Sequence, residues 1–177
     1  MKHAESITSQ PHRSELVPVR PVPSHGTLTV RVRYCECDPM GVAHHASYIP
    51  WLEMGRTELL RDSGVSYAQL EQAGIFLVIT KLEVKYRRPL FYDDIVQVRT
   101  TVIGGSRVKI EHTYELLLAE DGGHGKAKSP QGSPVTVEPM TLAERSIGLS
   151  LAIASTQLAC VGRDGRVQEL PEWLTSR

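Results

Sequence analysis

In the stretch TLTVRVRYCECDPMGVAHHASYIPWLEMGRTELLRDSG, residues 27–64, the hydrophobic period changes partway along, and this change indicates the fold. Over 27–37 apolar and polar residues alternate, which is the period of a β-strand. Over 47–61 the apolar residues recur at helical spacing, and Pro50 falls in the first turn, where its missing N–H is not needed. With Ser47 as N-cap and Gly64 as stop, the pattern predicts a long, mostly buried helix.

The residues after this helix predict mainly strands. A short helix over 66–74 precedes a strand over 75–89. The stretch 94–120 is typical of a long hairpin whose turn is Gly104-Gly105-Ser106, and 149–161 predicts a last strand. The fold class expected from this order is α+β, with a five-stranded antiparallel sheet wrapped around a long central helix.

Two segments stand apart from the expected domain. Residues 1–26 contain four prolines and no apolar block, so we expect a flexible N-terminal arm without a signal peptide before a domain over 27–174. The segment at about 121–147 is rich in Gly, Pro, Ser and Lys, which predicts an inserted loop with a short helix over 141–146.

Composition narrows the class of protein. The 177 residues suit one domain, and 20 basic against 20 acidic residues leave a net charge of zero, which argues against nucleic acid as the main partner. No apolar run approaches the roughly 18 residues of a membrane span. Three cysteines form no disulfide framework, which predicts a cytoplasmic protein.

The junction ECDPMGVAHHASY, residues 36–48, concentrates polar groups between strand and helix. Cys35, Cys37, His44 and His45 are potential metal ligands, but the C-x-C spacing and the adjacent histidines suit a metal site poorly. We therefore expect no metal site, and instead small buried cysteines that pack on the helix. The same interpretation applies to Cys160 in the last strand.

The alternatives for this junction are a plain turn and a catalytic turn. Asp38 would end a strand, Gly41 permits a sharp turn, and the following helix start offers unpaired N–H groups to a carbonyl that becomes an oxyanion. A carboxylate facing those donors can act as base or nucleophile. Since Asp-Pro is also common in ordinary turns, the residue types alone leave both interpretations open.

Residues 32–64 resemble the 4-hydroxybenzoyl-CoA thioesterase group of the hotdog-fold superfamily, which includes YbgC-like acyl-CoA thioesterases. That group carries an Asp after the first strand, then a Gly, a His or aromatic residue seven positions beyond the Asp, a Tyr, and a helix with an Arg-Thr-Glu segment. The matching positions are Asp38, Gly41, His45, Tyr48 and 56–58. The similarity extends over about 27–120 and 149–174, and it implies a hotdog fold.

The resemblance also implies roles for these residues. Asp38 would be the general base or nucleophile that attacks an acyl-CoA thioester, and the N–H of His45 would polarise the thioester carbonyl. The ring of His45 would orient water or substrate, or else serve as a cap or interface group. Gly41, His44 and Tyr48 would form the substrate pocket, with His44 in its wall.

The resemblance implies that the basic cluster Lys85, Arg87 and Arg88 would reach the phosphates of CoA, and the alternative is a solvated edge of the sheet. His112 shares a strand face with apolar residues, and this pattern predicts that it is a core histidine. The resemblance implies a homodimer or homotetramer and no cofactor beyond the CoA of the substrate. A non-catalytic protein that binds acyl-CoA or acyl-carrier protein is the alternative, whereas the His-Phe-Pro signature of hotdog dehydratases is absent.

Overall fold

The computed structural model describes residues 15–123 and 145–175. The strands are β1 (His25–Arg31), β2 (Phe76–Tyr86), β3 (Ile95–Ser106), β4 (Lys109–Glu120) and β5 (Ser150–Val161). The helices are α1 (Tyr48–Asp62), α2 (Tyr67–Gln72) and α3 (Glu172–Thr175), and two 3-10 turns, η2 (Tyr34–Glu36) and η3 (His45–Ser47), precede α1. Among the described residues, no helix combines the length and the apolar composition that a membrane-spanning helix requires.

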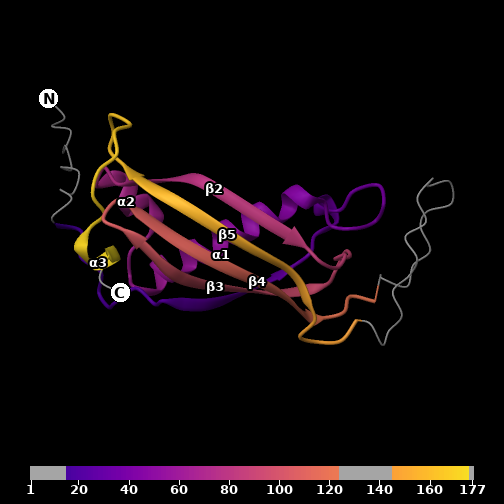
Figure 1. Cartoon of the computed structure of the whole chain (residues 1–177). Helices are drawn as coiled ribbons and strands as arrows, with labels where there is room; N and C mark the ends of the chain where they lie inside the picture. Colours follow the sequence, from indigo (N-terminus) through magenta and orange to yellow (C-terminus); the bar gives the residue numbers. More distant parts are fainter. Residues whose placement is uncertain (1–14, 124–144, 176–177) are drawn as a thin grey trace, which may run out of the picture.

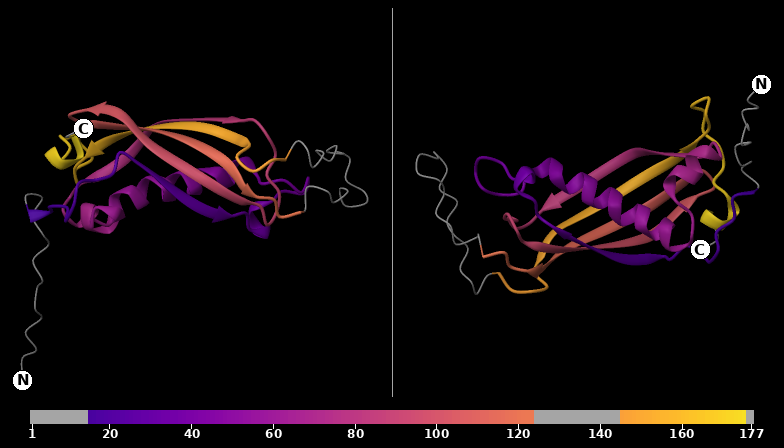
Figure 2. Two further views of the ribbon diagram at one scale, coloured as in Figure 1. Left: turned by 90° about the horizontal axis from the view of Figure 1, so that it is seen from below. Right: turned by 180° about the vertical axis from the view of Figure 1, so that it is seen from behind.

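All five strands form one sheet in the order β1-β3-β4-β5-β2, and every neighbouring pair is antiparallel. The long helix α1 lies along one face of this curved sheet (Figures 1 and 2). The α+β class is therefore confirmed, with a five-stranded antiparallel sheet and a single longer helix.

The core lies between α1 and the sheet. Alternate residues of β3, β4 and β5 point toward the helix and are buried there, while their neighbours point to the other face. Trp51 and Leu52 of α1 are almost fully buried in this layer. A Cβ added at Gly55 would lie 2.5 Å from Thr100 Oγ1, so helix and sheet approach too closely there for a larger residue.

The face of α1 that points away from the sheet is open. Ile49 and Met54 on this face are 37% and 39% exposed, and Glu53 is exposed as well. The prediction of a mostly buried helix is therefore wrong for the single chain, because one sheet covers only one side of a helix (Figure 2).

The first strand is shorter at its C-terminal end than its alternating pattern predicts. It ends at Arg31, and the chain then turns in η2, where the N–H of Glu36 donates to the carbonyl of Arg33. The Glu36 carboxylate accepts the N–H of Arg33 in return, at 2.8 Å. This local pair of hydrogen bonds replaces ladder pairing, so Asp38 does not sit on a strand end.

The packed part of the chain begins before the predicted boundary at Thr27. Leu16 is buried, and its carbonyl accepts the Nε1–H of Trp173 at 3.0 Å. The N–H groups of Val19 and Arg20 both donate to the carbonyl of Ser63 at the end of α1. Residues 15–24 are thus attached to the domain, and His25 and Gly26 belong to β1. Residues 1–14 of the predicted arm lie outside the described residues.

The hairpin of β3 and β4 has a different turn from the one predicted. Gly104 and Gly105 belong to β3, where the register shifts, and Ser106 pairs with Lys109. The turn is therefore Arg107-Val108. A Cβ on Gly105 would lie 2.1 Å from the carbonyl oxygen of Lys109, so the glycine permits close approach of the two strands instead of reversing the chain.

Both described ends of the predicted insertion are attached beside the β2–β3 loop. Arg145 is buried, forms an ion pair with Asp94, and donates from Nη1 to the carbonyl of Pro89 at 3.3 Å. The N–H of Gly122 donates to Asp94 Oδ1 at 3.0 Å. Residues 124–144, and with them most of the predicted short helix over 141–146, lie outside the described part of the chain.

Candidate active site

Asp38 lies in a tight turn that precedes α1. The N–H of Gly41 donates to the carbonyl of Asp38 at 2.9 Å, and Gly41 adopts a φ of +81°, which favours glycine. The N–H of Met40 donates to Asp38 Oδ1 at 2.8 Å, the Asx-type contact of an ordinary turn. Asp38 Oδ2 accepts no hydrogen bond from the described residues, so the plain-turn geometry uses only one of its two carboxylate oxygens.

A histidine caps the 3-10 turn η3, which leads directly into α1. His44 Nδ1 accepts the N–H of Ala46 at 3.2 Å. Ser47 holds the N-cap position of α1 as predicted, but its hydroxyl donates to the carbonyl of Glu36 at 2.9 Å and caps no helical N–H. Over residues 15–123 and 145–175, no carbonyl or side chain accepts the N–H of His45. That donor therefore remains available at the positive end of the helix dipole.

A pocket of about 370 Å³ opens at this end of α1. Its wall comes from the turn, the start of α1, the end of β2 and the loop that follows β2. Five of the predicted site residues line it: Asp38, His45, Tyr48, Arg87 and Arg88. The structure thus brings together residues that are up to 50 positions apart in the chain.

Two predicted site residues do not line this pocket. Gly41 shapes the turn through its backbone. The ring of His44 caps η3 and packs at a tilt against the His45 ring, with ring centroids 4.0 Å apart. The role of His44 as pocket wall therefore stays a prediction. Its ring accepts the Ala46 N–H at the start of η3, which immediately precedes α1.

Tyr86, which the sequence interpretation did not select, also lines the pocket. Its hydroxyl donates to the carbonyl of His45 at 3.0 Å, and its ring meets the Tyr48 ring edge-on, with centroids 4.9 Å apart. Burial raises the pKa of both phenols, most strongly that of Tyr48, so both remain neutral in the pocket wall. The alternation of Leu82, Val84 and Tyr86 could have indicated this inward position.

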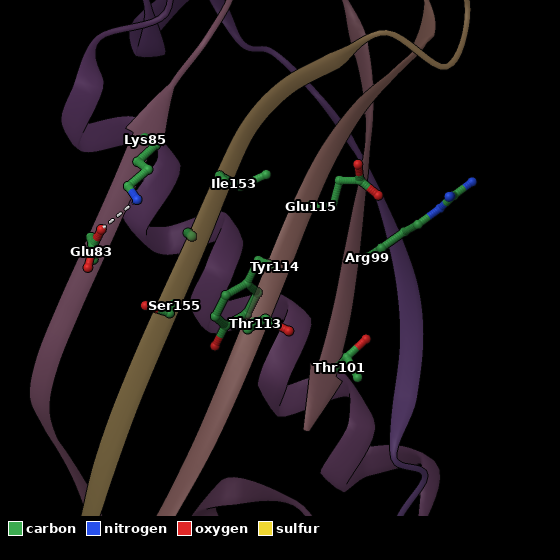
Figure 3. Close-up of a pocket in the computed structure, with 10 residues that line it drawn as sticks. Glu83, Lys85, Arg99, Thr101, Thr113, Tyr114, Glu115, Ile153 and Ser155 are labelled. Atoms are coloured by element: carbon green, nitrogen blue, oxygen red, sulfur yellow. Dashed lines mark ion pairs between the residues drawn. The ribbon is translucent and has the colours of Figure 1, made fainter. Parts of the chain in front are cut away.

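The three basic residues Lys85, Arg87 and Arg88 do not lie at the same pocket. Arg87 and Arg88 are exposed at the pocket and form no ion pair with the described residues, so both charges are free to meet an anion. Lys85 instead points to the outer face of the sheet and pairs with Glu83 at 3.3 Å, as Figure 3 shows. The grouping of Lys85 with the two arginines is therefore wrong.

A larger hollow, of about 510 Å³, lies on that outer face (Figure 3). Its rim carries Glu83, Lys85, Arg99 and Glu115, and α1 lies behind the sheet in this view. It contains none of the predicted site residues. Size alone therefore does not select the site.

The cysteines and His112 occupy different environments. Cys160 and His112 are buried as predicted, but Cys35 is exposed and Cys37 half-buried, because η2 replaces the expected strand. Burial raises the pKa of the Cys37 thiol. Within residues 15–123 and 145–175, no group of three or more His, Cys, Asp or Glu side chains could hold a metal ion.

Comparison with known proteins places the chain in a family. Residues 32–177 match the model of the thioesterase-like superfamily. The acyl-CoA thioester hydrolase YbgC of Escherichia coli O6:H1 is 30% identical over 122 residues, which cover 69% of this chain and 89% of YbgC. The putative acyl-CoA thioesterase YneP of Bacillus subtilis is 33% identical over 87 residues, which cover 49% of this chain and 63% of YneP.

Solved structures agree with this assignment. The DHNA-CoA thioesterase of Staphylococcus aureus superimposes with a TM-score of 0.64 at 26% identity, covering 86% of this chain and 85% of that chain. The 4-hydroxybenzoyl-CoA thioesterase of Pseudomonas sp. strain CBS-3 gives a TM-score of 0.64 at 15% identity over 85% of this chain and 96% of that chain, which shows the shared fold. The chain therefore belongs to the thioesterase-like superfamily, in the hotdog-fold group of 4-hydroxybenzoyl-CoA and YbgC-like thioesterases that its residues 32–64 resemble.

Proposed function

We propose that this thioester hydrolase cleaves an acyl-CoA thioester to the free acid and CoA at the pocket beside Asp38. The observation that carries the proposal is the meeting of a carboxylate with one free oxygen and the unpaired N–H of His45 at the rim of one open pocket. A base or nucleophile opposite an oxyanion donor is the arrangement that acyl transfer requires.

Asp38 has two chemically balanced paths in this proposal. As general base it takes a proton from water, the hydroxide adds to the thioester carbonyl, and the tetrahedral oxyanion expels the CoA thiolate. As nucleophile it attacks the carbonyl itself, expels the thiolate, and leaves a mixed anhydride that water hydrolyses. Both paths place negative charge on the carbonyl oxygen, which the N–H of His45 and the helix start stabilise.

Arg87 and Arg88 are proposed to hold the phosphates of CoA. Both guanidinium groups stand at the pocket without a carboxylate partner among the described residues, and a guanidinium fork matches the geometry of a phosphate. The neutral phenols of Tyr48 and Tyr86 give the inner wall an aromatic character. The proposed reaction uses water and the side chains of this protein, and needs no metal or redox cofactor.

A panel of aromatic and aliphatic acyl-CoA thioesters, with thiol release as readout, tests this proposal. Turnover of any member supports hydrolysis, and the preferred acyl group identifies the substrate class. Tight binding of panel members without thiol release would contradict the proposal and would favour a protein that binds acyl-CoA or acyl-carrier protein without catalysis.

A further inference from the structure

We infer that Glu36 is a positioning residue that holds the turn of Asp38 in register with the start of α1. Glu36 touches neither the pocket nor any group that would meet substrate. It is instead hydrogen-bonded to Arg33 after β1, to Ser47 just before α1, and to Trp51 in the first turn of α1. The inference deepens the proposed function and rests on it for its kinetic consequence.

The carboxylate of Glu36 is buried, with 7% of the residue exposed, and both of its oxygens are occupied. Oε1 accepts the indole Nε1–H of Trp51 at 3.0 Å and the Nη2–H of Arg33 at 2.7 Å. Oε2 accepts the backbone N–H of Arg33 at 2.8 Å. Trp51 is itself fully buried against the sheet, so the carboxylate is fixed to the rigid core of the molecule.

The backbone carbonyl of Glu36 makes two more hydrogen bonds. It accepts the N–H of His44 at 2.8 Å and the hydroxyl of Ser47 at 2.9 Å. Residues 36–44 therefore form a closed loop whose two ends meet at this carbonyl. Inside it, Cys37 bridges to Ala43, and the N–H of Asp38 donates to the carbonyl of Val42.

This arrangement sets the separation between the two groups that the reaction needs. Asp38 lies two residues after Glu36, and the donor N–H of His45 lies one residue after His44, which Glu36 binds. A shift at Glu36 therefore moves the carboxylate relative to the oxyanion donor. Misplacement of a reacting group by about 1 Å can reduce the rate by about 100-fold.

A buried carboxylate is a poor choice if stability is its only purpose. Its cation partner Arg33 is 68% exposed, and taking a carboxylate out of water offsets much of what an ion pair contributes. A carboxylate does, however, offer acceptors on both oxygens, which three donors occupy here. A glutamine of the same shape would present an NH2 group to one of those donors and would disturb the loop.

The test compares Glu36→Gln, Asp38→Asn and the double variant for kcat and KM on the best substrate of the acyl-CoA panel. Glu169→Gln is the matched control, since Glu169 forms an exposed ion pair with Arg107 far from the pocket. We expect Glu36→Gln to lower kcat by about 10- to 100-fold with KM within about twofold, and the control to leave both unchanged. In the Asp38→Asn background, Glu36→Gln should cause no further loss.

Full kcat in a folded Glu36→Gln variant would overturn the inference. So would a double variant whose loss of kcat equals the product of the losses in the two single variants. If Glu36→Gln fails to fold by circular dichroism, Trp51→Phe takes its place, because it removes one donor and keeps the carboxylate. That variant should show the same lack of additivity with Asp38→Asn. Absence of turnover by the wild type on the whole panel would instead refute the proposed function. In that case the amide NMR shifts of residues 37–45 still test whether Glu36 holds the loop: changed shifts in Glu36→Gln support this role, and unchanged shifts contradict it.

Discussion

Asp38 and Glu36 are two carboxylates two residues apart in opposite environments. Asp38 shares the pocket with solvent and uses one oxygen in its own turn, whereas Glu36 is buried with both oxygens bonded. Burial alone would raise the pKa of Glu36. The hydrogen bonds from the Arg33 side chain, the Arg33 backbone and Trp51, together with the Arg33 charge, outweigh burial and hold that pKa below its ordinary value.

The lowered pKa of Glu36 predicts a loss of stability in acid. Its contribution is complete above the ordinary carboxyl pKa of about 4.3 and disappears as pH falls through the lowered pKa of the folded state. Urea unfolding of the wild type and Glu36→Gln from about pH 7 to about pH 3 should show curves that differ at neutral pH and converge in acid. A difference that stays constant across this range would contradict the prediction.

Residue types could predict only part of this site. Asp38, His45 and Tyr48 lie on the pattern that defines the family resemblance, and Arg87 and Arg88 form an evident basic cluster. Glu36 could not be identified, since the alternating pattern extends a strand through it and the hydrogen bond from Trp51 depends on the tertiary fold. Tyr86 alternates with Leu82 and Val84, which indicates its face of the strand, but only the fold brings the end of that strand to the pocket.

At the scale of elements, the junction before α1 departs most from its sequence pattern. The alternation over 27–37 predicts a longer strand, but the reciprocal hydrogen bonds of Arg33 and Glu36 end it early. Ser47 has the residue type of an N-cap, yet it already adopts helical dihedral angles and its hydroxyl binds a distant carbonyl. The helix stop at Gly64 and the short helix with its Ser66 cap were predictable, because their hydrogen bonds are local.

Substitutions of the two adjacent histidines at this junction should have different effects, one on stability and the other on activity. His44→Ala removes the acceptor of the Ala46 N–H and should lower the free energy of unfolding by about 1 kcal/mol. His45→Ala keeps its backbone donor and the cap, so it should leave stability nearly unchanged and lower kcat less than Asp38→Asn does. Denaturant unfolding measures the stability of each variant, and thiol release measures its kcat. A loss of stability in His45→Ala with unchanged stability in His44→Ala would contradict the prediction.

At the scale of the whole molecule, the ends of the predicted insertion belong to the core. Asp94 and Arg145 are buried as an ion pair, and the Arg145 guanidinium lies over the Phe91 ring, 4.7 Å from its centroid. A replacement of 122–146 by a short turn, which the Gly- and Pro-rich composition favours, would therefore remove a buried charge partner. Long-range pairing of this kind leaves no sign in local composition.

Arg145→Met should destabilise the protein by about 3–5 kcal/mol, because Asp94 keeps a buried charge without its cation. Replacement of 124–144 alone by a short Gly-containing linker keeps Asp121, Gly122 and Arg145, and should leave Tm nearly unchanged, since loop closure depends weakly on length. Thermal unfolding measures the Tm of both variants and of the wild type. Equal stability of Arg145→Met and the wild type would refute the structural role of the pair.

The open edge of β2 and the open face of α1 predict a homodimer or a homotetramer. Val78 and Ile79 on β2 are each 42% exposed, and Tyr86 at the end of that strand lines the pocket, so a second chain paired along β2 would lie beside the site. Light scattering at assay concentration should find a dimer or larger, with activity lost on dissociation. An active monomer would contradict a site completed by the partner.

Thiol release by Asp38→Asn is the direct test of whether the Asp38 carboxylate drives thioester hydrolysis. Asparagine retains an oxygen that can accept the Met40 N–H, so the variant should keep the turn, the fold and the Tm of the wild type. Its kcat on the preferred acyl-CoA should nevertheless fall by about 100-fold or more, because the amide is neither base nor nucleophile. Near-normal turnover by this folded variant would remove Asp38 from the mechanism and with it the proposed site.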